Sequence, residues 1–136
     1  MRDIYDHTEA SYPNECCGLM IGTMSGADTR VVHTFRKCSN LNTERARDRY
    51  QLDPLDMLKA EREFEGSPWD IVGIYHSHPD HPSRPSQTDT DGAFPVYSYV
   101  IISVQKGTVA SANSWVLNER ERRFYEEPLV TEGEKK

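Results

Sequence analysis

The sequence lacks any long hydrophobic run: no stretch approaches the roughly 20 apolar residues that a membrane-spanning helix needs. The first residues, 1–6, also lack the apolar segment that secretory signals carry. Hydrophobic residues make up 36% of the 136 residues and charged residues 28%, which is typical of a globular protein with one core. We therefore expect a single domain over residues 1–130 and a disordered tail over 131–136.

Cysteine is scarce. Cys16, Cys17 and Cys38 form an odd number and contain no C-x-x-C pair, which argues against a disulfide framework and is typical of a reducing, cytoplasmic setting. Neighbouring side chains in a strand point to opposite faces, so Cys16 and Cys17 are poorly placed to share a structural zinc with Cys38. We interpret the adjacent pair as small core residues.

Positive charge is also limited, since 16 Lys and Arg residues face 22 Asp and Glu residues and give a net charge of −6. Binding to a phosphate backbone depends on clustered Lys and Arg, so this balance argues against nucleic acid as the main partner. Arg45, Arg47 and Arg49 form a small local basic patch. We interpret the patch as a solvated loop or helix face, with a docking site for an acidic partner as the alternative.

Hydrophobic periodicity predicts both strands and helices. Strands are expected over apolar or alternating segments, namely 15–22, 30–37, 70–77, 97–104, 108–117 and 122–130. Helices are expected over 3–11, from Asp53 to about Glu65, and in a short turn that begins near Ser86. Asp53 is a typical N-cap, and Pro54 suits the first helical position. Strands at both ends with helices between them predict an α+β fold, a three-layer αβα sandwich around a mixed sheet.

The densest chemistry lies in residues 76–89, which read H-S-H-P-D-H-P-S-R-P-S-Q-T-D at the end of the expected strand 70–77. Side chains alternate along a strand, so His76 and His78 point to the same face and form half of a metal site. Asp89, brought back by the intervening loop, is the natural third ligand. Catalytic zinc sites have three such protein ligands and leave the fourth position to water.

Two imidazoles and one carboxylate suit Zn²⁺, whereas Mg²⁺ and Ca²⁺ prefer more oxygen ligands. Ferrous iron takes the same ligand set, but the sequence shows none of the cosubstrate-binding residues that iron oxygenases need. Zinc lowers the pKa of its bound water to about 7, so the sequence predicts a hydrolytic centre. His81, in the loop between the ligands, is either a substitute ligand or, as we expect, an exposed loop residue.

A hydrolase also needs a carboxylate that moves protons between the water and the leaving group. Glu15 is an attractive candidate because it lies at the edge of an apolar strand that can lie beside the histidine strand. Glu9, Glu61 and Glu63 are alternatives on expected helix faces, and the spacing alone does not select among the four. Ser86 is either an oxyanion donor or the N-cap of the short helix, and both readings stay open.

Two motifs together resemble the JAMM (MPN-plus) zinc metalloproteases. The first is His-x-His, seven residues, Ser, two residues and Asp, which is matched without a gap by His76, His78, Ser86 and Asp89. The second is a Glu ahead of a Gly-Leu-h-h-Gly strand, present as Glu15 before C-C-G-L-M-I-G. The segments Y-Q-L-D-P, V-G-I-Y and Y-V-I-I-S are similar to those of the small, single-domain prokaryotic members. The resemblance covers nearly the whole chain.

The resemblance implies a JAMM/MPN (cytidine-deaminase-like) fold, with a curved mixed sheet flanked by helices. It implies Zn²⁺ held by His76, His78 and Asp89. It also implies that Glu15 is the general base and acid and that Ser86 is the oxyanion donor.

The resemblance further implies a substrate. Members of the prokaryotic branch hydrolyse the amide bond after the C-terminal Gly-Gly of a ubiquitin-like or sulfur-carrier protein. We therefore expect such a carrier tail as the partner, and neither nucleic acid nor membrane. Two alternatives remain, a non-catalytic MPN scaffold for protein interactions and a DNA-repair-associated JAMM-like protein. The intact ligand set argues against the first, and the net negative charge argues against the second.

Overall fold

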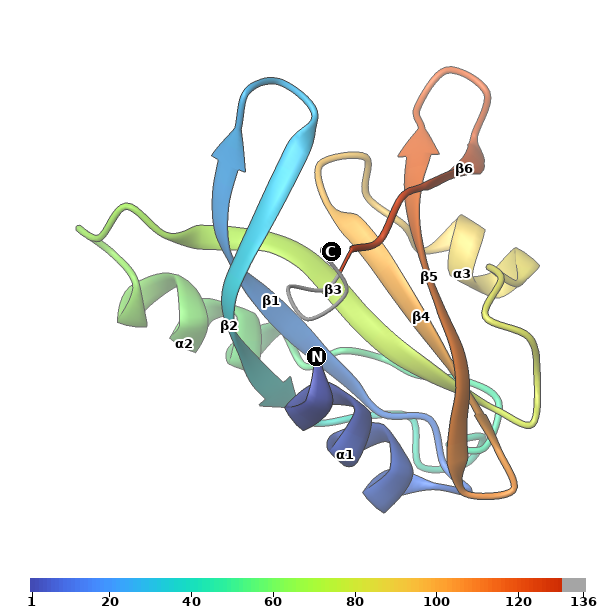
Figure 1. Ribbon diagram of the computed structural model, residues 1–136. Helices are drawn as coiled ribbons and strands as arrows, with labels where there is room; N and C mark the ends of the chain where they lie inside the picture. Colours follow the sequence, from blue (N-terminus) through green and yellow to red (C-terminus); the bar gives the residue numbers. More distant parts are fainter. Residues whose placement is uncertain (131–136) are drawn as a thin grey trace.

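A mixed sheet of six strands, in the order β2-β1-β3-β4-β5-β6, organises the chain (Figure 1). The computed structural model describes residues 1–130, so the tail expected over 131–136 lies outside the described residues. The strands are β1 (Cys17–Ser25), β2 (Thr29–Cys38), β3 (Asp70–Pro79), β4 (Ser98–Gln105), β5 (Thr108–Asn118) and β6 (Arg123–Glu127). Neighbouring strands are antiparallel except β3 and β4, which run parallel. Parallel neighbours need a crossover, so the chain leaves the sheet at the carboxyl end of β3.

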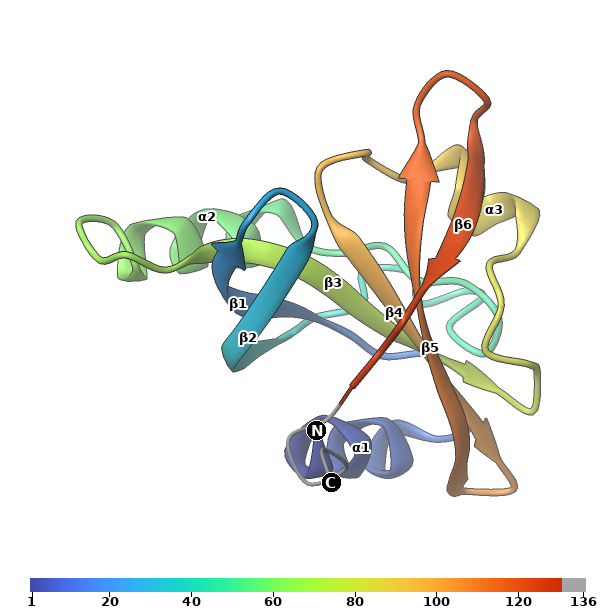
Figure 2. The ribbon, with the colours of Figure 1, turned by 45° about the horizontal axis from the view of Figure 1, so that its top comes forward.

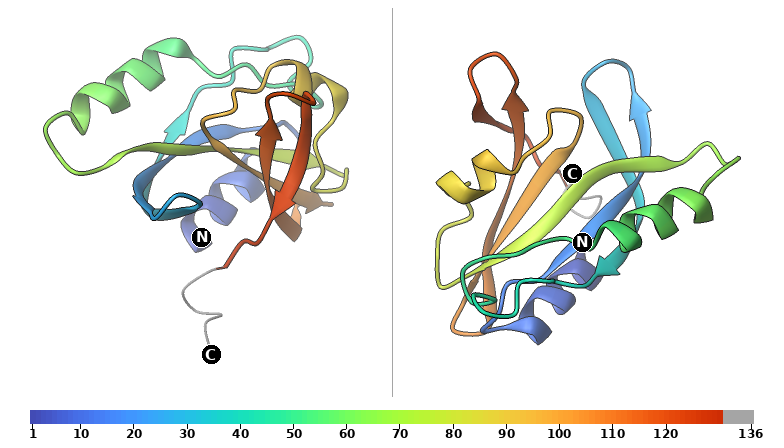
Figure 3. Two further views of the ribbon diagram at one scale, coloured as in Figure 1. Left: turned by 90° about the horizontal axis from the view of Figure 1, so that it is seen from above. Right: turned by 180° about the vertical axis from the view of Figure 1, so that it is seen from behind.

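Helices cover both faces of the sheet. α1 (Arg2–Ser11) lies on one face and α2 (Pro54–Glu63) on the other, while the short α3 (Gln87–Asp91) lies in the crossover from β3 to β4 (Figure 3). Asp53 caps α2 as expected, since its side chain accepts a hydrogen bond from the backbone N–H of Leu55. This layering confirms the expected α+β sandwich. Within residues 1–130, none of the helices has the length and apolarity needed to cross a membrane.

Two apolar clusters hold the layers together. The cluster under α1 includes Ile4, Met20, Tyr75, Val100, Ile102 and Val104. The cluster under α2 includes Leu19, Ile21, Ala60, Ile74, Tyr99 and Leu117. Successive strand residues point to opposite faces, which is why the neighbours Leu19 and Met20 belong to different clusters. The sheet twists from one edge to the other, and β3 and β4 lie at its centre (Figure 2).

Close packing explains both glycines of the C-C-G-L-M-I-G segment. A Cβ at Gly18 would lie 2.2 Å from the ring of Tyr75, which crosses β1 at this point. Tyr75 is fully buried, and its hydroxyl lies 2.6 Å from His7 Nδ1, so the ring has little room to move. A Cβ at Gly22 would lie 1.8 Å from the carbonyl oxygen of Val31. Both positions therefore require the absence of a side chain.

The loop over residues 41–51, here called the 41–51 loop, is held closed by the side chain of Asn40. Its Oδ1 accepts hydrogen bonds from backbone N–H groups at both ends of the loop, at 2.9 Å each. Its Nδ2 donates to the carbonyl oxygens of Glu15 and Arg49, at 3.1 Å each. One side chain thus ties the loop to Glu15, two residues before β1.

Several strand ends differ from the sequence expectation: β1 continues to Ser25 and β3 to Pro79, and two other ends have a clear cause. β1 begins at Cys17 rather than at residue 15, because the N–H of Glu15 bonds to the carbonyl of Ala46 at 2.6 Å instead of to a neighbouring strand. β6 stops directly before Pro128 and does not reach residue 130. Proline has no N–H to donate to a strand ladder, which accounts for the shorter strand.

Substitution of Gly18 by alanine tests the packing of Tyr75 on β1. The added methyl group overlaps the Tyr75 ring, so we expect Gly18→Ala to lower the free energy of unfolding by about 1–3 kcal/mol. Gly92→Ala is the matched control, because its Cβ would lie 3.7 Å from the nearest atom and its φ of −95° suits any residue. Urea unfolding of both variants measures the difference. Equal stability of the two variants would contradict the packing argument.

Candidate metal centre

Three side chains from two elements converge at the carboxyl end of β3. His76 and His78 lie two residues apart in β3, and Asp89 reaches them from α3. The two Nε2 atoms are 3.1 Å apart. Asp89 places Oδ1 3.3 Å from Nε2 of His76 and Oδ2 3.0 Å from Nε2 of His78. Both histidines are buried and Asp89 is half-buried, so the structure brings together the three residues expected as ligands.

The donor atoms fit a cation better than a hydrogen-bonded cluster. Nδ1 of His78 lies 2.8 Å from the carbonyl oxygen of Pro82, which only accepts hydrogen bonds, so Nε2 of a neutral His78 carries a lone pair. That lone pair faces the Asp89 carboxylate and the second imidazole. Four-coordinate zinc, with bonds of roughly 2.0–2.1 Å, separates its ligand atoms by about 3.3 Å. The observed separations of 3.0, 3.1 and 3.3 Å match this geometry.

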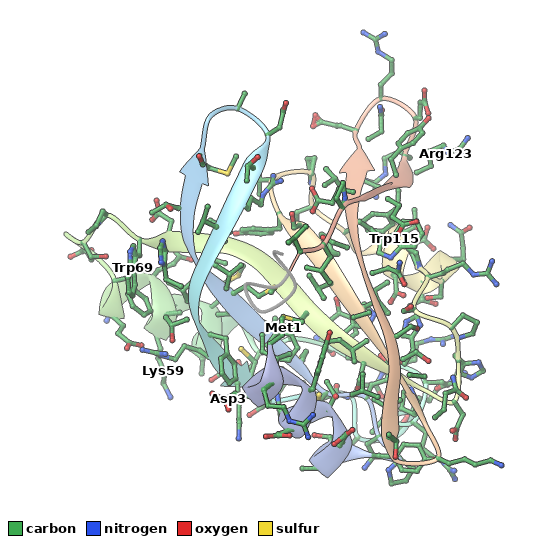
Figure 4. All side chains as sticks on the ribbon, viewed as in Figure 1. Met1, Asp3, Lys59, Trp69, Trp115 and Arg123 are labelled. Atoms are coloured by element: carbon green, nitrogen blue, oxygen red, sulfur yellow. The ribbon has the colours of Figure 1, made fainter. Side chains whose placement is uncertain are left out.

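A contact with β5, here called the Ser83 clasp, fixes the loop between the ligands. Ser83 is buried, and its hydroxyl donates to Oδ1 of Asn113 at 2.5 Å. The indole N–H of Trp115 on β5 (Figure 4) donates to the carbonyl of Ser83 at 3.0 Å. Pro82 directly precedes Ser83, so the clasp also fixes the carbonyl that orients His78.

A capping box holds Asp89. The hydroxyl of Ser86, the N-cap of α3, accepts from the N–H of Asp89 at 3.1 Å, and Asp89 Oδ2 accepts from the N–H of Ser86 at 2.9 Å. The capping alternative for Ser86 is therefore observed. A hydroxyl that accepts through its oxygen keeps its own hydrogen to donate, and Ser86 is exposed. Capping and donation to an oxyanion are thus compatible in one side chain.

The electrostatics favour an ionised Asp89 and a neutral His76. Burial opposes the charge on Asp89, but hydrogen bonds from both imidazoles and from the N–H of Ser86 hold the pKa of Asp89 well below its usual range. Burial lowers the pKa of His76 despite the nearby carboxylate. Burial also acts to lower the pKa of His78, but the hydrogen bonds to Asp89 and Pro82 outweigh it and raise that pKa overall. His78 therefore holds a proton more strongly than an ordinary histidine does.

Glu15 adds a buried carboxyl group beside the ligands. Its side chain is buried, and Oε1 has no hydrogen-bond partner among residues 1–130. Burial is the main cause that raises the pKa of Glu15 to about 8. The charge of His78 acts to lower this pKa, and the charge of Asp89 acts to raise it. The group is therefore able to hold or release a proton near neutral pH.

The other sequence candidates have different surroundings. Glu63 forms an ion pair with Arg36 at 2.5 Å, and Glu9 accepts a backbone N–H of β5 at 2.9 Å. Glu61 is exposed on α2. His81 is exposed and does not belong to the cluster of three ligands.

Two contacts at the site were not predicted from the sequence, although Tyr50 opens the Y-Q-L-D-P segment of the resemblance. The ring of Tyr50 stacks on the imidazole of His76, with 4.3 Å between centroids and 23° between planes. Asn40 joins the carbonyl of Glu15 to the 41–51 loop. Both involve a polar, aperiodic segment that meets residues far away in the sequence. Spacing alone therefore offered no way to find them.

Known proteins are similar to this chain in sequence and in fold. The chain matches prokaryotic homologs of the JAB domain over residues 1–118. It is 38% identical over 92 residues to the desampylase of Haloferax volcanii, covering 67% of this chain and 63% of that protein. It is 34% identical over 100 residues to the CysO-cysteine peptidase of Mycobacterium tuberculosis, covering 73% of this chain and 65% of that protein. The chain thus spans less than two thirds of the length of either relative.

A solved structure agrees with these matches. The solution structure of a protein from Desulfitobacterium hafniense superimposes with a TM-score of 0.81 and 31% sequence identity, covering 96% of this chain and 86% of that one. The matched region, 1–118, contains Glu15 and the cluster of His76, His78 and Asp89. The chain therefore belongs to the family of prokaryotic homologs of the JAB domain, as the resemblance to JAMM proteins predicted.

Proposed function

We propose that this protein is a zinc-dependent peptidase or isopeptidase. Its proposed reaction is hydrolysis of the amide bond after the C-terminal Gly-Gly of a ubiquitin-like or sulfur-carrier protein. One observation carries the proposal: the buried, unpaired carboxyl of Glu15 lies near His78 and Asp89, in a set of three donors that would leave the fourth position of a tetrahedral zinc to water. A site built only to hold a structural ion has no need of such a group.

The donor set supports zinc as the metal. His76, His78 and Asp89 offer two imidazole nitrogens and a carboxylate, a set that suits zinc and leaves a coordination position open. When bound there, zinc would supply Lewis-acid activation of water at neutral pH. Tyr50 and the Ser83 clasp hold the ligand side chains in place for this ion.

Glu15 and Ser86 would perform the proton transfer and the charge stabilisation. Glu15 takes a proton from the attacking water and delivers it to the leaving nitrogen, a role that is best served by a pKa near the working pH. Its raised pKa of about 8 meets that requirement. The free hydrogen of Ser86 would donate to the oxyanion that develops on the glycine carbonyl.

The relatives support a carrier protein as the substrate. One relative is named a desampylase and another a CysO-cysteine peptidase, and the second name describes action on a CysO-cysteine bond. An extended Gly-Gly tail would need little more than access to the metal and to Ser86, which is exposed. The non-catalytic scaffold alternative gives no role to the unpaired carboxyl of Glu15.

Replacement of Glu15 by glutamine separates chemistry from metal binding. Glu15→Gln keeps the shape of the side chain but cannot carry protons, so we expect full zinc occupancy and a loss of about 10²–10⁴-fold in kcat. Intact mass spectrometry of a carrier with one residue beyond Gly-Gly measures turnover. Glu61→Gln, at an exposed position on α2, is the control and should retain activity. Loss of zinc from Glu15→Gln would show instead that Glu15 is a ligand.

Ligand variants test the assignment of the metal site. His78→Ala and Asp89→Asn each remove one ligand, so we expect both to lose stoichiometric zinc and activity. His81→Ala removes a nearby histidine outside the cluster and should keep both. Zinc content after gel filtration, with circular dichroism as a check on folding, measures the outcome. Full zinc occupancy in Asp89→Asn would refute the proposed ligand set.

Acid should release the metal because protons compete for His78. The hydrogen bonds that raise the pKa of His78 keep it protonated, in the metal-free protein, to a higher pH than an ordinary histidine. Zinc binding must displace that proton. The apparent affinity for zinc therefore reaches its full value above this pKa and falls by about tenfold per pH unit below it. Competition with a chelator between about pH 5 and 8 measures the affinity. An affinity that does not change over this range would contradict histidine ligation.

A further inference from the structure

The proposed hydrolysis gives two products: the carrier, which keeps the glycine carbonyl, and a leaving residue, which keeps the nitrogen. The site therefore has a carrier side and a leaving side. Because Glu15 passes a proton to the leaving nitrogen, the departing residue must lie next to Glu15. When that residue is attached through its α-amino group, its carboxylate carbon lies about 2.5 Å from the same nitrogen. A lysine side chain joined by an isopeptide bond has no carboxylate at this place. A cation beside Glu15 would therefore distinguish the two leaving groups.

Arg49 is a cation that the fold places beside Glu15. Nδ2 of Asn40 donates to the carbonyl oxygens of both residues at 3.1 Å, so a single amide group joins the two backbones. Arg49 also directly precedes Tyr50, whose ring stacks on the ligand His76. Its positive charge acts to lower the pKa of Glu15, against the larger effects of burial and of the Asp89 and Asp48 carboxylates, which raise it. The backbone of Arg49 is thus tied to that of Glu15 and directly precedes the residue that stacks on His76.

The neighbouring acidic side chain, Asp48, forms a close ion pair with Arg45 and a longer one with Arg49. Arg45 places Nη2 and Nε at 2.5 and 3.2 Å from the two carboxylate oxygens, and this hydrogen bonding lowers the pKa of Asp48. Nη1 of Arg49 donates to the backbone carbonyl of Asp48 at 2.8 Å and lies 3.8 Å from its carboxylate.

The guanidinium of Arg49 keeps free donors. Its Nε and Nη2 make no hydrogen bond with any residue that the structure describes, and its side chain is 31% exposed. Two N–H groups in a fork match the two oxygens of a carboxylate. The guanidinium therefore keeps a fork of donors that suits a carboxylate, close enough to Glu15 for its charge to act on that side chain.

We propose that Arg49 binds the free α-carboxylate of a single residue attached beyond the Gly-Gly end of the carrier. This inference rests on the proposed function and specifies its leaving group as a terminal amino acid. The oxygen of water bonds to the glycine carbonyl carbon, the C–N bond breaks, and the nitrogen departs with a proton from Glu15. The products are a carrier that ends in a Gly-Gly carboxylate and a free amino acid.

Two forms of one substrate test the inference. A carrier with one residue beyond Gly-Gly is prepared with either a terminal carboxylate or a terminal carboxamide, and only the first gives Arg49 a charged partner. We expect zinc-loaded wild type to show a kcat/KM about tenfold higher on the carboxylate form, mainly through a lower KM. Salt screens a half-exposed ion pair, so the preference should shrink as ionic strength rises.

Variants of the loop assign the preference to one residue. Arg49→Gln removes the charge and should bring the ratio of the two kcat/KM values to about one. Arg49→Lys keeps the charge without the fork and should retain part of the preference. Arg47→Gln is the matched control, because Arg47 is exposed in the same loop and its charge acts on Asp80 rather than on Glu15. Zinc content and circular dichroism verify that each variant is folded.

Three results would overturn the inference. The first is equal cleavage of both forms by wild type. The second is a decrease of both rates by the same factor in Arg49→Gln, and the third is loss of the preference in Arg47→Gln as well. Hydrolysis of neither form by zinc-loaded wild type would contradict the proposed function itself. Failure of the chemistry is thus distinguished from failure of the role given to Arg49.

Discussion

Nε2 of His78 lies 3.0 Å from the Asp89 carboxylate and 3.1 Å from Nε2 of a second imidazole, an arrangement that requires a cation or a proton between them. The surrounding structure preserves this contact. The two apolar clusters fix β3 in the centre of the sheet, the Ser83 clasp fixes the loop that follows it, and the capping box of α3 fixes Asp89. Backbone polar groups thus orient His78 and Asp89 from outside the cluster, as they do for the histidines of known metal sites.

The 41–51 loop lies against Glu15 and His76 and brings further residues close to the cluster. Asn40 connects it to the backbone of Glu15, and Tyr50 closes it over His76. In the proposed reaction, proton transfer by Glu15 and binding of the leaving residue by Arg49 both depend on this loop, whereas Ser86 and the metal act on the carrier side. The capping interaction of Ser86 keeps its hydrogen free, so one short helix would both position Asp89 and stabilise the oxyanion.

Much of this architecture could be predicted from the sequence. Period-two apolar patterns indicated the strands, and the spacing of His76, His78 and Asp89 indicated the ligands, because alternation along a strand is a local property. The role of Glu15 depends on burial, and the parts played by Asn40 and Tyr50 depend on contacts between distant segments. Gly18 was visible only as part of a motif, since its necessity comes from the Tyr75 ring that crosses it. The local sequence pattern thus predicts candidate ligands, whereas the groups that surround them depend on tertiary contacts.

X-ray absorption at the zinc edge of the reconstituted protein tests the central claim most directly. The account predicts a first shell of nitrogen and oxygen atoms at about 2.0–2.1 Å, with the outer-shell scattering of two imidazoles. A scatterer at about 2.3 Å would indicate sulfur from a cysteine, and an oxygen-only shell would exclude both histidines. Either result would contradict a centre formed by His76, His78 and Asp89.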